Sequence, residues 1–451
     1  MLLRVLVLSL LKLAVRIFFR QRKVVGTEHI PEGRAVIFVG NHPNSLIDPL
    51  VAITSSPRHI HFAAKDVLFE SRVLRVFLGA MGSVPIRRRK DHPDGPLDNA
   101  VAFQALYKVL EDRGAIGIFP EGVSHDEAHL MKIKTGAARI ALGLVSQNPE
   151  LDLVIVPIGL NYTNPRQFRS RVLVQFGEPL SVDSAWAARY ESETKASVDS
   201  LTDTIQKRLE GLTINAPDWR TVRLLDGVRR LYQPPRISLE ERIELARRFN
   251  RAYLEHKNDP KVQELLERVD EYQERLEDLD LTDEELRRAT TSRRLFRTFV
   301  LKLAWFFIWL PLAAPGFIVH APLGLLAGWG GRRFTPRKDV IGTAKMMAGA
   351  SVVLLFYMAL LVFAYGYWGS HGALIALALF PLSGYATIRV LERTASLRRL
   401  IGRATRAFFI RRELEELRAM RQLLQENLIE EVHARMPEGL VPLFPKEVSR
   451  S

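Results

Sequence analysis

Short apolar runs and polar turns alternate along the first half of the chain. Runs rich in β-branched and aromatic residues predict buried strands, and they lie at 35–39, 59–63, 115–119, 153–158 and 171–176. Between them, apolar residues recur at the spacing of an α-helix, over 66–79, 97–112 and 134–146. Strands that alternate with helices in this way predict one α/β domain over residues 24–215.

The segments that flank this domain have a different pattern. Residues 1–23 are largely apolar, with Lys12 and Arg16 on one helix face, and they predict an N-terminal helix on the membrane surface. A helix that covers the core of the α/β domain is the alternative. Residues 216–297 combine charges of both signs with leucines at helical spacing, which predicts a charged helical arm. A homodimeric coiled coil would need longer and more regular heptads.

Residues 298–390 form the most apolar region, which is long enough for helices that cross a bilayer. Prolines interrupt 298–329, which predicts a re-entrant hairpin, whereas 346–368 and 373–388 predict a crossing pair joined by a tight loop. Basic clusters before, between and after these runs favour the cytoplasmic side. The sequence therefore predicts an integral membrane protein with its α/β domain on the cytoplasmic face. Residues 391–451 predict a C-terminal amphipathic helix and tail.

The charge balance narrows the class of partner. The 451 residues carry 64 Lys and Arg against 50 Asp and Glu, a formal net charge of +14. This balance favours anionic partners, among them nucleic acid, anionic lipid and phosphorylated substrates. The sequence has no nucleic-acid-binding motif, and its apolar stretches favour a membrane. Because the chain has no cysteine, disulfides, thiolate metal sites and a cysteine acyl-enzyme are excluded.

Candidate chemistry begins at the end of the first predicted strand. Breaker residues follow it, so His42 is expected at the mouth of a strand-to-helix turn, where reactive side chains of α/β folds reach ligand. A histidine with a nearby Asp48 can take a proton from a hydroxyl, because the carboxylate fixes the tautomer of the imidazole. The alternative is structural, since Ser45-x-x-Asp48 also fits a helix capping box.

Three further segments carry polar residues at the ends of apolar runs. In 82–90, Arg87 and Arg88 belong to four consecutive cations that suit a phosphate clamp, although a solvated basic loop is the alternative. Glu121 stands in a tight loop between proline and glycine, where its carboxylate can accept from substrate hydroxyls, hold an arginine or be a surface acid. Pro157 interrupts an apolar run, which predicts an edge strand or a bulge that shapes a pocket.

These four segments, in this order and at these spacings, resemble the four motif blocks of the glycerolipid acyltransferase family. That family includes the glycerol-3-phosphate and 1-acylglycerol-3-phosphate O-acyltransferases. The resemblance covers about residues 24–215 and is most specific at Phe119-Pro120-Glu121-Gly122. It implies a mixed sheet flanked by helices, with the C-terminal helical membrane region outside it.

The resemblance also implies a role for each matching residue. His42 matches the general base of the family, and Asp48 matches its partner. The arginine that binds substrate phosphate matches Arg88, with Arg87 beside it. The acceptor site and its lining match the remaining three residues, Glu121, Gly122 and Pro157.

One departure from the usual family pattern concerns the first block. Five residues separate His42 from Asp48 here, where the family usually has four. This longer form, with Phe-Pro-Glu-Gly-x-Ser-His-Asp, is similar to the fungal-type glycerol-3-phosphate acyltransferases. Residues six apart on one helix lie about 240° apart, so the two side chains can meet only if the turn between them folds back.

The implied reaction is direct transfer of a fatty acyl group from an acyl thioester, on coenzyme A or acyl carrier protein, to glycerol 3-phosphate or lysophosphatidic acid. No cofactor or metal is expected, because His125 and His129 near Asp126 lack a convincing ligand set. Ser124 is a weaker nucleophile candidate, since no G-x-S-x-G elbow surrounds it. The alternatives are acylation of another lysophospholipid or lipid alcohol, and a non-catalytic membrane scaffold.

Overall fold

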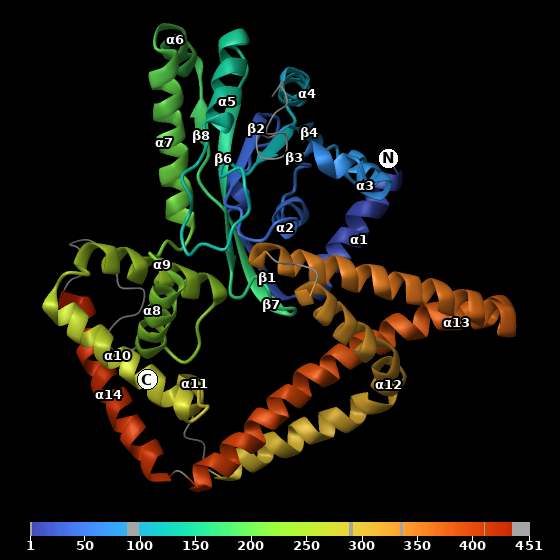
Figure 1. The fold of residues 1–451 in the computed structure, drawn as a ribbon, viewed down its shortest axis with the longest axis vertical. Coiled ribbons are helices and arrows are strands. Elements are labelled where there is room, and N and C mark those ends of the chain that lie inside the picture. The colour runs from blue at the N-terminus through green and yellow to red at the C-terminus, as the bar shows by residue number, and fades with distance from the viewer. Residues whose placement is uncertain (1, 88–98, 288–291, 334–336, 410, 435–451) are drawn as a thin grey trace. The chain divides into compact units, whose positions relative to one another are not determined.

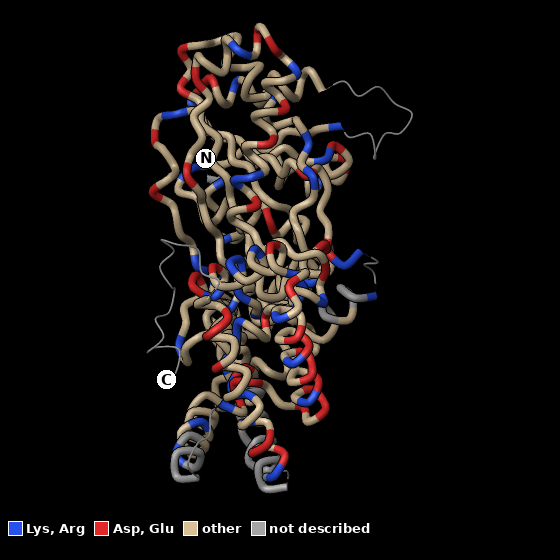
Figure 2. Tube along the Cα trace, turned by 90° about the vertical axis from the view of Figure 1, so that its left-hand side faces the viewer, with Lys and Arg blue, Asp and Glu red and all other residues tan. Residues whose placement is uncertain are grey.

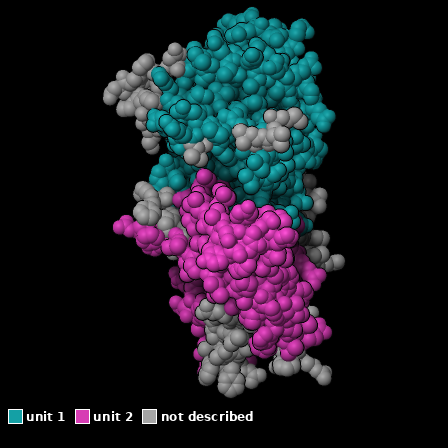
Figure 3. Space-filling view, turned by 90° about the vertical axis from the view of Figure 1, so that its right-hand side faces the viewer, with its two compact units in different colours: residues 1–219, 239–250, 336–343 teal, residues 220–238, 251–335, 344–451 magenta. Residues whose placement is uncertain are grey.

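The computed structural model describes residues 2–87, 99–287, 292–333, 337–409 and 411–434. Two compact units divide the chain (Figure 3). Unit 1 comprises residues 1–219, 239–250 and 336–343, and unit 2 comprises 220–238, 251–335 and 344–451. The domain expected over 24–215 falls wholly within unit 1, which also takes in short segments from much further along the chain.

An eight-stranded sheet forms the centre of unit 1 (Figure 1). Its order is β1-β7-β6-β2-β5-β3-β4, with β8 paired to β6. Strand β6 is antiparallel to β7 and β8, and the other pairs are parallel, so the mixed sheet implied by the resemblance is confirmed. The strands are β1 (Phe19–Val25), β2 (Ala35–Gly40), β3 (His61–Lys65), β4 (Val84–Ile86), β5 (Ala115–Ile118), β6 (Leu153–Tyr162), β7 (Ser170–Phe176) and β8 (Leu180–Val182).

Helices cover the sheet and complete the hydrophobic core. Alternate residues of β2, such as Ile37 and Val39, face a core built with Leu106, Ala141 and Leu201 of three different helices, as the period of a strand requires. The helices of this unit are α1 (Leu2–Phe18), α2 (Ile47–Ser55), α3 (Arg72–Ala80), α4 (Ala100–Glu111), α5 (Gly136–Gln147), α6 (Ser184–Ser192) and α7 (Thr194–Leu212), with 3₁₀ turns η1 (Thr27–His29) and η2 (Asp66–Phe69).

The predicted elements are largely present, with local differences. Strand β3 begins two residues later than expected, and the helix expected over 66–79 is divided into η2 and α3. The division occurs at Ser71, whose side chain caps α3 by accepting from the Leu74 amide. Strand β1 was not predicted because four polar residues dominate it; it is an edge strand, where charged side chains prevent unwanted pairing.

Pro157 lies in β6, which is an interior strand, so the edge position predicted for it is wrong. Its carbonyl accepts from the Gly177 amide at 2.8 Å, on the side of the strand where β8 pairs with residues 153–155 and β7 pairs from Ile158 onward. Pro157 therefore falls in the gap between two partner strands. Its missing N–H costs no ladder hydrogen bond there.

Helix α1 has the properties of both interpretations of the N-terminal segment. Leu11, Val15 and Phe18 are buried against unit 1, whereas Leu6 and Leu10 are each 56% exposed. One face thus covers the core of the domain, and the opposite face presents apolar side chains at the surface.

Unit 2 is built from helices that carry charges of both signs or long apolar stretches (Figure 2). Within it, the buried carboxylate of Asp283 accepts hydrogen bonds from Tyr272 at 2.9 Å and from Arg421 at 2.8 Å. These bonds join three helices of the region. The helices are α8 (Trp219–Tyr232), α9 (Leu239–His256), α10 (Pro260–Asp278), α11 (Asp283–Arg287), α12 (Ser292–Arg333), α13 (Ile341–Phe409) and α14 (Arg411–Ala434); most of α9, the start of α13 and the whole 3₁₀ turn η3 (Lys338–Val340) belong to unit 1.

Within the part of the chain that the structure describes, two helical stretches are long and apolar enough to cross a membrane, Phe299–Leu326 and Lys338–Thr394. Helix α12 keeps helical structure through its three prolines and bends sharply along its length (Figure 1), and the re-entrant hairpin expected at 298–329 stays a prediction. Thr387 of α13 donates to the carbonyl of Ala313 at 3.1 Å within this part of α12. Helix α13 is interrupted at Gly369, which has φ 66°, inside the tight loop expected between the crossing pair.

Candidate functional site

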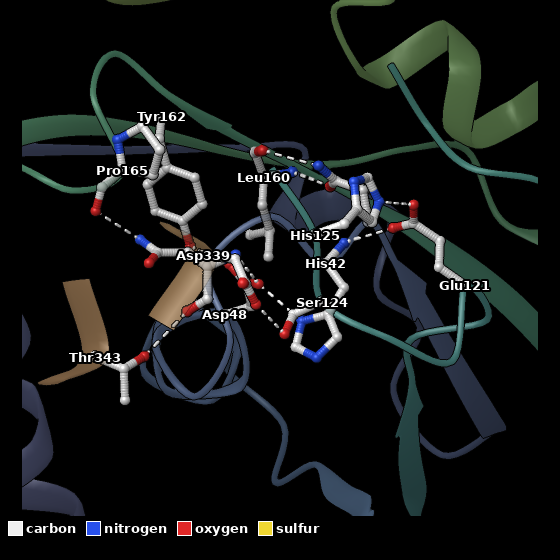
Figure 4. Close-up of polar contacts among 12 residues, drawn as sticks. His42, Asp48, Glu121, Ser124, His125, Leu160, Tyr162, Pro165, Asp339 and Thr343 are labelled. Atoms are coloured by element: carbon white, nitrogen blue, oxygen red, sulfur yellow. Dashed lines mark hydrogen bonds and ion pairs between the residues drawn. The ribbon is translucent and has the colours of Figure 1, made fainter. Parts of the chain in front are cut away.

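The candidate site lies where neighbouring parallel strands end. Strands β2 and β5 are adjacent and parallel, and His42 follows the first while Glu121 follows the second. Because the carboxyl ends of parallel strands meet at one edge of the sheet, both residues lie together there. Figure 4 shows His42, Asp48, Glu121 and His125 in this cluster.

The turn after β2 folds back and brings His42 to Asp48. Nδ1 of His42 lies 2.8 Å from Oδ2 of Asp48. Ser45 makes the reversal, since its φ of 47° is in the left-handed region. The capping-box alternative is wrong, because α2 has Leu46 at its N-cap and no side-chain cap bond. The extra residue in this block is thus accommodated in the turn.

Asp48 is fully buried and is surrounded by hydrogen-bond donors. Tyr162 donates to its Oδ1 at 2.7 Å, and the Asn44 amide donates to its Oδ2 at 2.7 Å. Burial raises the pKa of the Asp48 carboxyl, and the hydrogen bonds from His42, Tyr162 and Asn44 oppose that shift. Burial and the charge of Asp48 raise the pKa of Tyr162 well above its usual range, so the phenol stays a donor.

The contact with Asp48 determines the tautomer of His42. With its carboxylate acting as an acceptor, Asp48 requires the proton on Nδ1, which leaves the lone pair on Nε2. Among the residues that the structure describes, Nε2 has no hydrogen-bonding partner. The side chain of His42 is 19% exposed, so the lone pair of this nitrogen is available to accept a proton.

An aromatic stack fixes the plane of the imidazole. The ring of His42 lies parallel to that of Phe119, with centroids 4.2 Å apart, and Phe119 stacks on Phe62 at 5.2 Å. Gly40 permits this arrangement, because a Cβ at that position would lie 3.2 Å from Cε1 of Phe119. Hydrogen bonding at Nδ1 and stacking on the ring face together orient Nε2.

Glu121 joins the two turns of the site through its carboxylate. Oε1 accepts from the His42 amide at 2.7 Å, and Oε2 accepts from the Met131 amide at 2.9 Å and from Nε2 of His125. Both oxygens therefore have protein donors, and the side chain of Glu121 holds the turn that carries His42. Its contact with the glycerol of a substrate stays a prediction. Gly122 has φ +74°, and a Cβ there would begin 2.6 Å from Nζ of Lys134.

His125 is tied to the same turn. Its Nδ1 lies 3.1 Å from the amide nitrogen of Glu127, so both ring nitrogens have protein partners. Burial lowers the pKa of His125, but the hydrogen bond to Glu121 and the charges of Glu121, Glu127 and Asp339 together raise this pKa by more, so that the net shift is upward. This histidine is a structural partner of Glu121, while His129 is exposed.

The predicted phosphate clamp is only partly described. Arg87 directly follows β4, is half-exposed and lies 3.7 Å from Asp66 in an ion pair. Asn99 bonds both the amide and the carbonyl of Arg87, at 2.9 and 3.0 Å. Arg88 lies outside the described residues. Pro157 is buried in the sheet beside Gly177, and its place in the site lining stays a prediction.

Several residues of the site had no assigned role in the sequence analysis. Asn41 exchanges two side-chain hydrogen bonds with the backbone of Leu160, at 2.8 and 3.1 Å, and so extends the pairing of β2 with β6. Tyr162 ends that strand, and the motif around Pro157 is the signal that could have found it. Asp339 and Thr343, which contact Ser124 and Asn44, lie outside every motif and gave no signal.

Two parts of the chain, one of which holds the His42–Asp48 pair, match family models of acyltransferases. Residues 21–161 match the family model described as Acyltransferase, and residues 224–334 match the one described as the glycerol-3-phosphate acyltransferase 2 C-terminal domain. Both matches agree with the resemblance to glycerolipid acyltransferases that the four motif blocks carry.

Curated relatives agree with the matches to the two family models. The chain is 35% identical over 257 residues to glycerol-3-phosphate O-acyltransferase 2 of Saccharomyces cerevisiae, covering 56% of this chain and 34% of the relative. It is 31% identical over 284 residues to glycerol-3-phosphate O-acyltransferase 1 of the same yeast, covering 58% and 37%. A 1-acyl-sn-glycerol-3-phosphate acyltransferase of Borreliella burgdorferi is 29% identical, covering 42% and 72%. The match thus spans about a third of the length of the two yeast relatives.

Proposed function

We propose that this protein transfers a fatty acyl group from an acyl thioester, on coenzyme A or acyl carrier protein, to a hydroxyl of glycerol 3-phosphate or lysophosphatidic acid. The observation that carries the proposal is the imidazole of His42, held at Nδ1 by Asp48 at 2.8 Å and with its Nε2 available. The names of the relatives, which are glycerol-3-phosphate and 1-acylglycerol-3-phosphate acyltransferases, support this choice of acceptor.

In the proposed reaction, Nε2 of His42 removes the proton of the acceptor hydroxyl as its oxygen attacks the thioester carbonyl. Asp48 stabilises the imidazolium that forms. When the tetrahedral intermediate collapses, the carbon–sulfur bond breaks and the imidazolium gives the proton to the departing thiolate. An ester and a free thiol result, with no covalent enzyme intermediate and no requirement for a metal or a cofactor.

The acceptor phosphate is assigned to the cations that follow β4. Strands β5, β3 and β4 are neighbours and parallel, so Arg87 leaves the sheet at the edge where His42 and Glu121 lie. Two strand spacings of about 5 Å each separate β4 from β5, a distance that a glycerol phosphate and an arginine side chain together can bridge. Arg88 and Arg87 would bind the phosphate oxygens through charge-assisted hydrogen bonds.

The membrane supplies the lipid part of the reaction in this proposal. The two candidate spans, Phe299–Leu326 and Lys338–Thr394, would anchor the chain, and the exposed apolar face of α1 would rest on the bilayer surface. The basic clusters that border the spans favour the cytoplasmic side, and this preference supports a catalytic domain on the cytoplasmic face.

The proposal is tested with the full chain purified in lipid nanodiscs and a labelled acyl donor. We expect label in glycerol 3-phosphate or lysophosphatidic acid, and loss of at least ~10³-fold in kcat for His42→Ala. His129→Ala removes an exposed histidine and serves as the matched control. Acylation of only phosphate-free acceptors would favour a lipid alcohol acyltransferase, and no acylation of any acceptor would favour a scaffold; either result contradicts the proposal.

A further inference from the structure

The segment of residues 337–343, which leads into α13, is built into unit 1 next to the candidate site. Ser124 donates from Oγ to Oδ2 of Asp339 at 2.5 Å. Nη2 of Arg337 donates to the carbonyl of Ser124 at 2.9 Å and to Asp339 at 2.7 Å. Ser124 and Asp339 lie at the turn that carries Glu121 and His125 (Figure 4), and Arg337 completes this polar cluster.

The same segment also reaches the turn after β2. Thr343 donates to the carbonyl of Asn44 at 3.3 Å, and the amide of Asn44 in turn donates to Asp48. A Cβ at Gly342 would lie 2.7 Å from Oδ1 of Asn44 and 2.6 Å from the carbonyl of Pro165. Residues 337–343 therefore touch both of the turns that hold the base.

A short path through Ser124 and the next residue joins Asp339 to the backbone of His42. The residue after Ser124 is His125, whose amide donates to the carbonyl of His42 at 3.3 Å. Asp339 is 6% exposed, and a buried carboxylate is retained only when donors surround it. Here those donors are Ser124 and Arg337, so the burial of Asp339 and the position of Ser124 depend on each other.

We propose that Asp339 is a positioning residue for the His42 base, acting through Ser124 and the turn that follows it. The inference rests on the proposed acyl transfer. Ser124 is on this account a donor committed to Asp339, and a nucleophilic role for it finds no support. Reaction rates are steeply sensitive to displacement of a catalytic group, by up to about 100-fold for 1 Å, so loss of this support should act on kcat.

The test compares Asp339→Ala with the wild-type full chain in nanodiscs. We expect kcat to fall by about 10- to 100-fold while KM for the acceptor and the thioester changes less than about 3-fold. Asp339→Asn keeps an acceptor for Ser124 and should recover part of kcat. Lys338→Ala alters an exposed neighbour in η3 and is the matched control.

A double-mutant cycle with Ser124→Ala identifies the path. If Asp339 acts through Ser124, the double variant should lose no more kcat than the worse single variant. Hydrogen exchange measured by mass spectrometry should also rise at the amides of His42 and His125 in Asp339→Ala, whatever the activity. Additive losses, an effect on KM alone, or unchanged exchange would overturn the inference. An inactive wild-type chain would instead overturn the proposed function, while the exchange result would still decide whether Asp339 holds the turn.

Discussion

His42 and Asp48 lie six positions apart in the sequence, and their side chains meet at 2.8 Å because Ser45 reverses the chain between them. Two helical residues at this separation would face different directions. The reversal turns a spacing that disfavours contact into one that permits it, and the carboxylate then sets the proton on Nδ1.

Asp48→Asn should retain the fold and lose most of the activity. The amide has a similar shape but carries no charge, so it cannot stabilise the imidazolium that forms when Nε2 takes the proton. We expect kcat to fall by about 10³- to 10⁴-fold, as for comparable histidine–carboxylate pairs, in initial-rate assays. Asp199→Asn changes an exposed acid of α7 and should retain full activity; an active Asp48→Asn enzyme would contradict the assigned role.

Gly40→Ala tests the aromatic stack. The added Cβ lies 3.2 Å from Cε1 of Phe119, so the ring must shift by a few tenths of an ångström and tilt the imidazole stacked on it. We expect a fall of about 10-fold in kcat, by analogy with other small displacements of catalytic groups, measured beside circular dichroism to confirm folding. Gly136→Ala, where the Cβ meets nothing within 4 Å, is the control. Equal kcat values for the two variants would show that the aromatic stack does not affect catalysis.

Arg88→Ala and Arg87→Ala should weaken binding of the acceptor. A hydrogen bond to a charged group contributes about 1.5–3 kcal/mol, so we expect KM for glycerol 3-phosphate to rise by at least about 10-fold for the residue that binds the phosphate. Phosphate-free acceptors should show no such change. Arg139→Ala replaces an exposed arginine of α5 and controls for loss of charge. An unchanged KM in both Arg87→Ala and Arg88→Ala would show that neither arginine binds the acceptor phosphate.

The stability of unit 1 should decline in mild acid because of His59. Burial, with contributions from His61 and Arg4, lowers the pKa of His59 to about 4, whereas an unfolded histidine titrates near pH 6.5. Between these values the unfolded chain binds a proton that the folded chain does not, so the free energy of unfolding falls as the pH drops from about 6.5 to 4.

Thermal unfolding of the detergent-solubilised chain at pH 7 and pH 4.5 measures this effect. His59→Gln should reduce the difference in Tm between the two conditions, because the variant has no proton to gain. His256→Gln is the comparison, at the end of α9. If the wild type and His59→Gln lost the same Tm on acidification, burial of a neutral His59 would not be the cause.

The sequence predicted those parts of the site that depend on local pattern. His42 and Glu121 each follow a short apolar strand, and parallel strands bring their ends together, so their proximity follows from the fold class. The meeting of His42 with Asp48 needed one further fact, the left-handed Ser45, which spacing alone does not reveal.

Other parts depend on contacts between distant segments. Nothing near Asp339 marks it as a partner of Ser124, since the two are 215 positions apart and the segment around it is a short polar link before an apolar helix. Pro157 shows the opposite case. Proline avoids interior strands because it lacks an N–H group, but β6 changes its partner strand from β8 to β7 at this residue, so no hydrogen bond of the sheet is lost there. The local sequence does not reveal where a strand changes its partner strand.

The contact between Ser124 and Asp339 has a consequence for biosynthesis. Translation proceeds from the N-terminus, so a ribosome has already delivered Phe299–Leu326, the earlier of the two apolar stretches, before Asp339 leaves the exit tunnel. A nascent chain that stops short of this point has His42, Asp48 and Glu121. It lacks Asp339, and therefore the contact that holds Ser124. The order of synthesis thereby delays completion of the contacts around His42 until the first apolar stretch long enough to cross a membrane has been made.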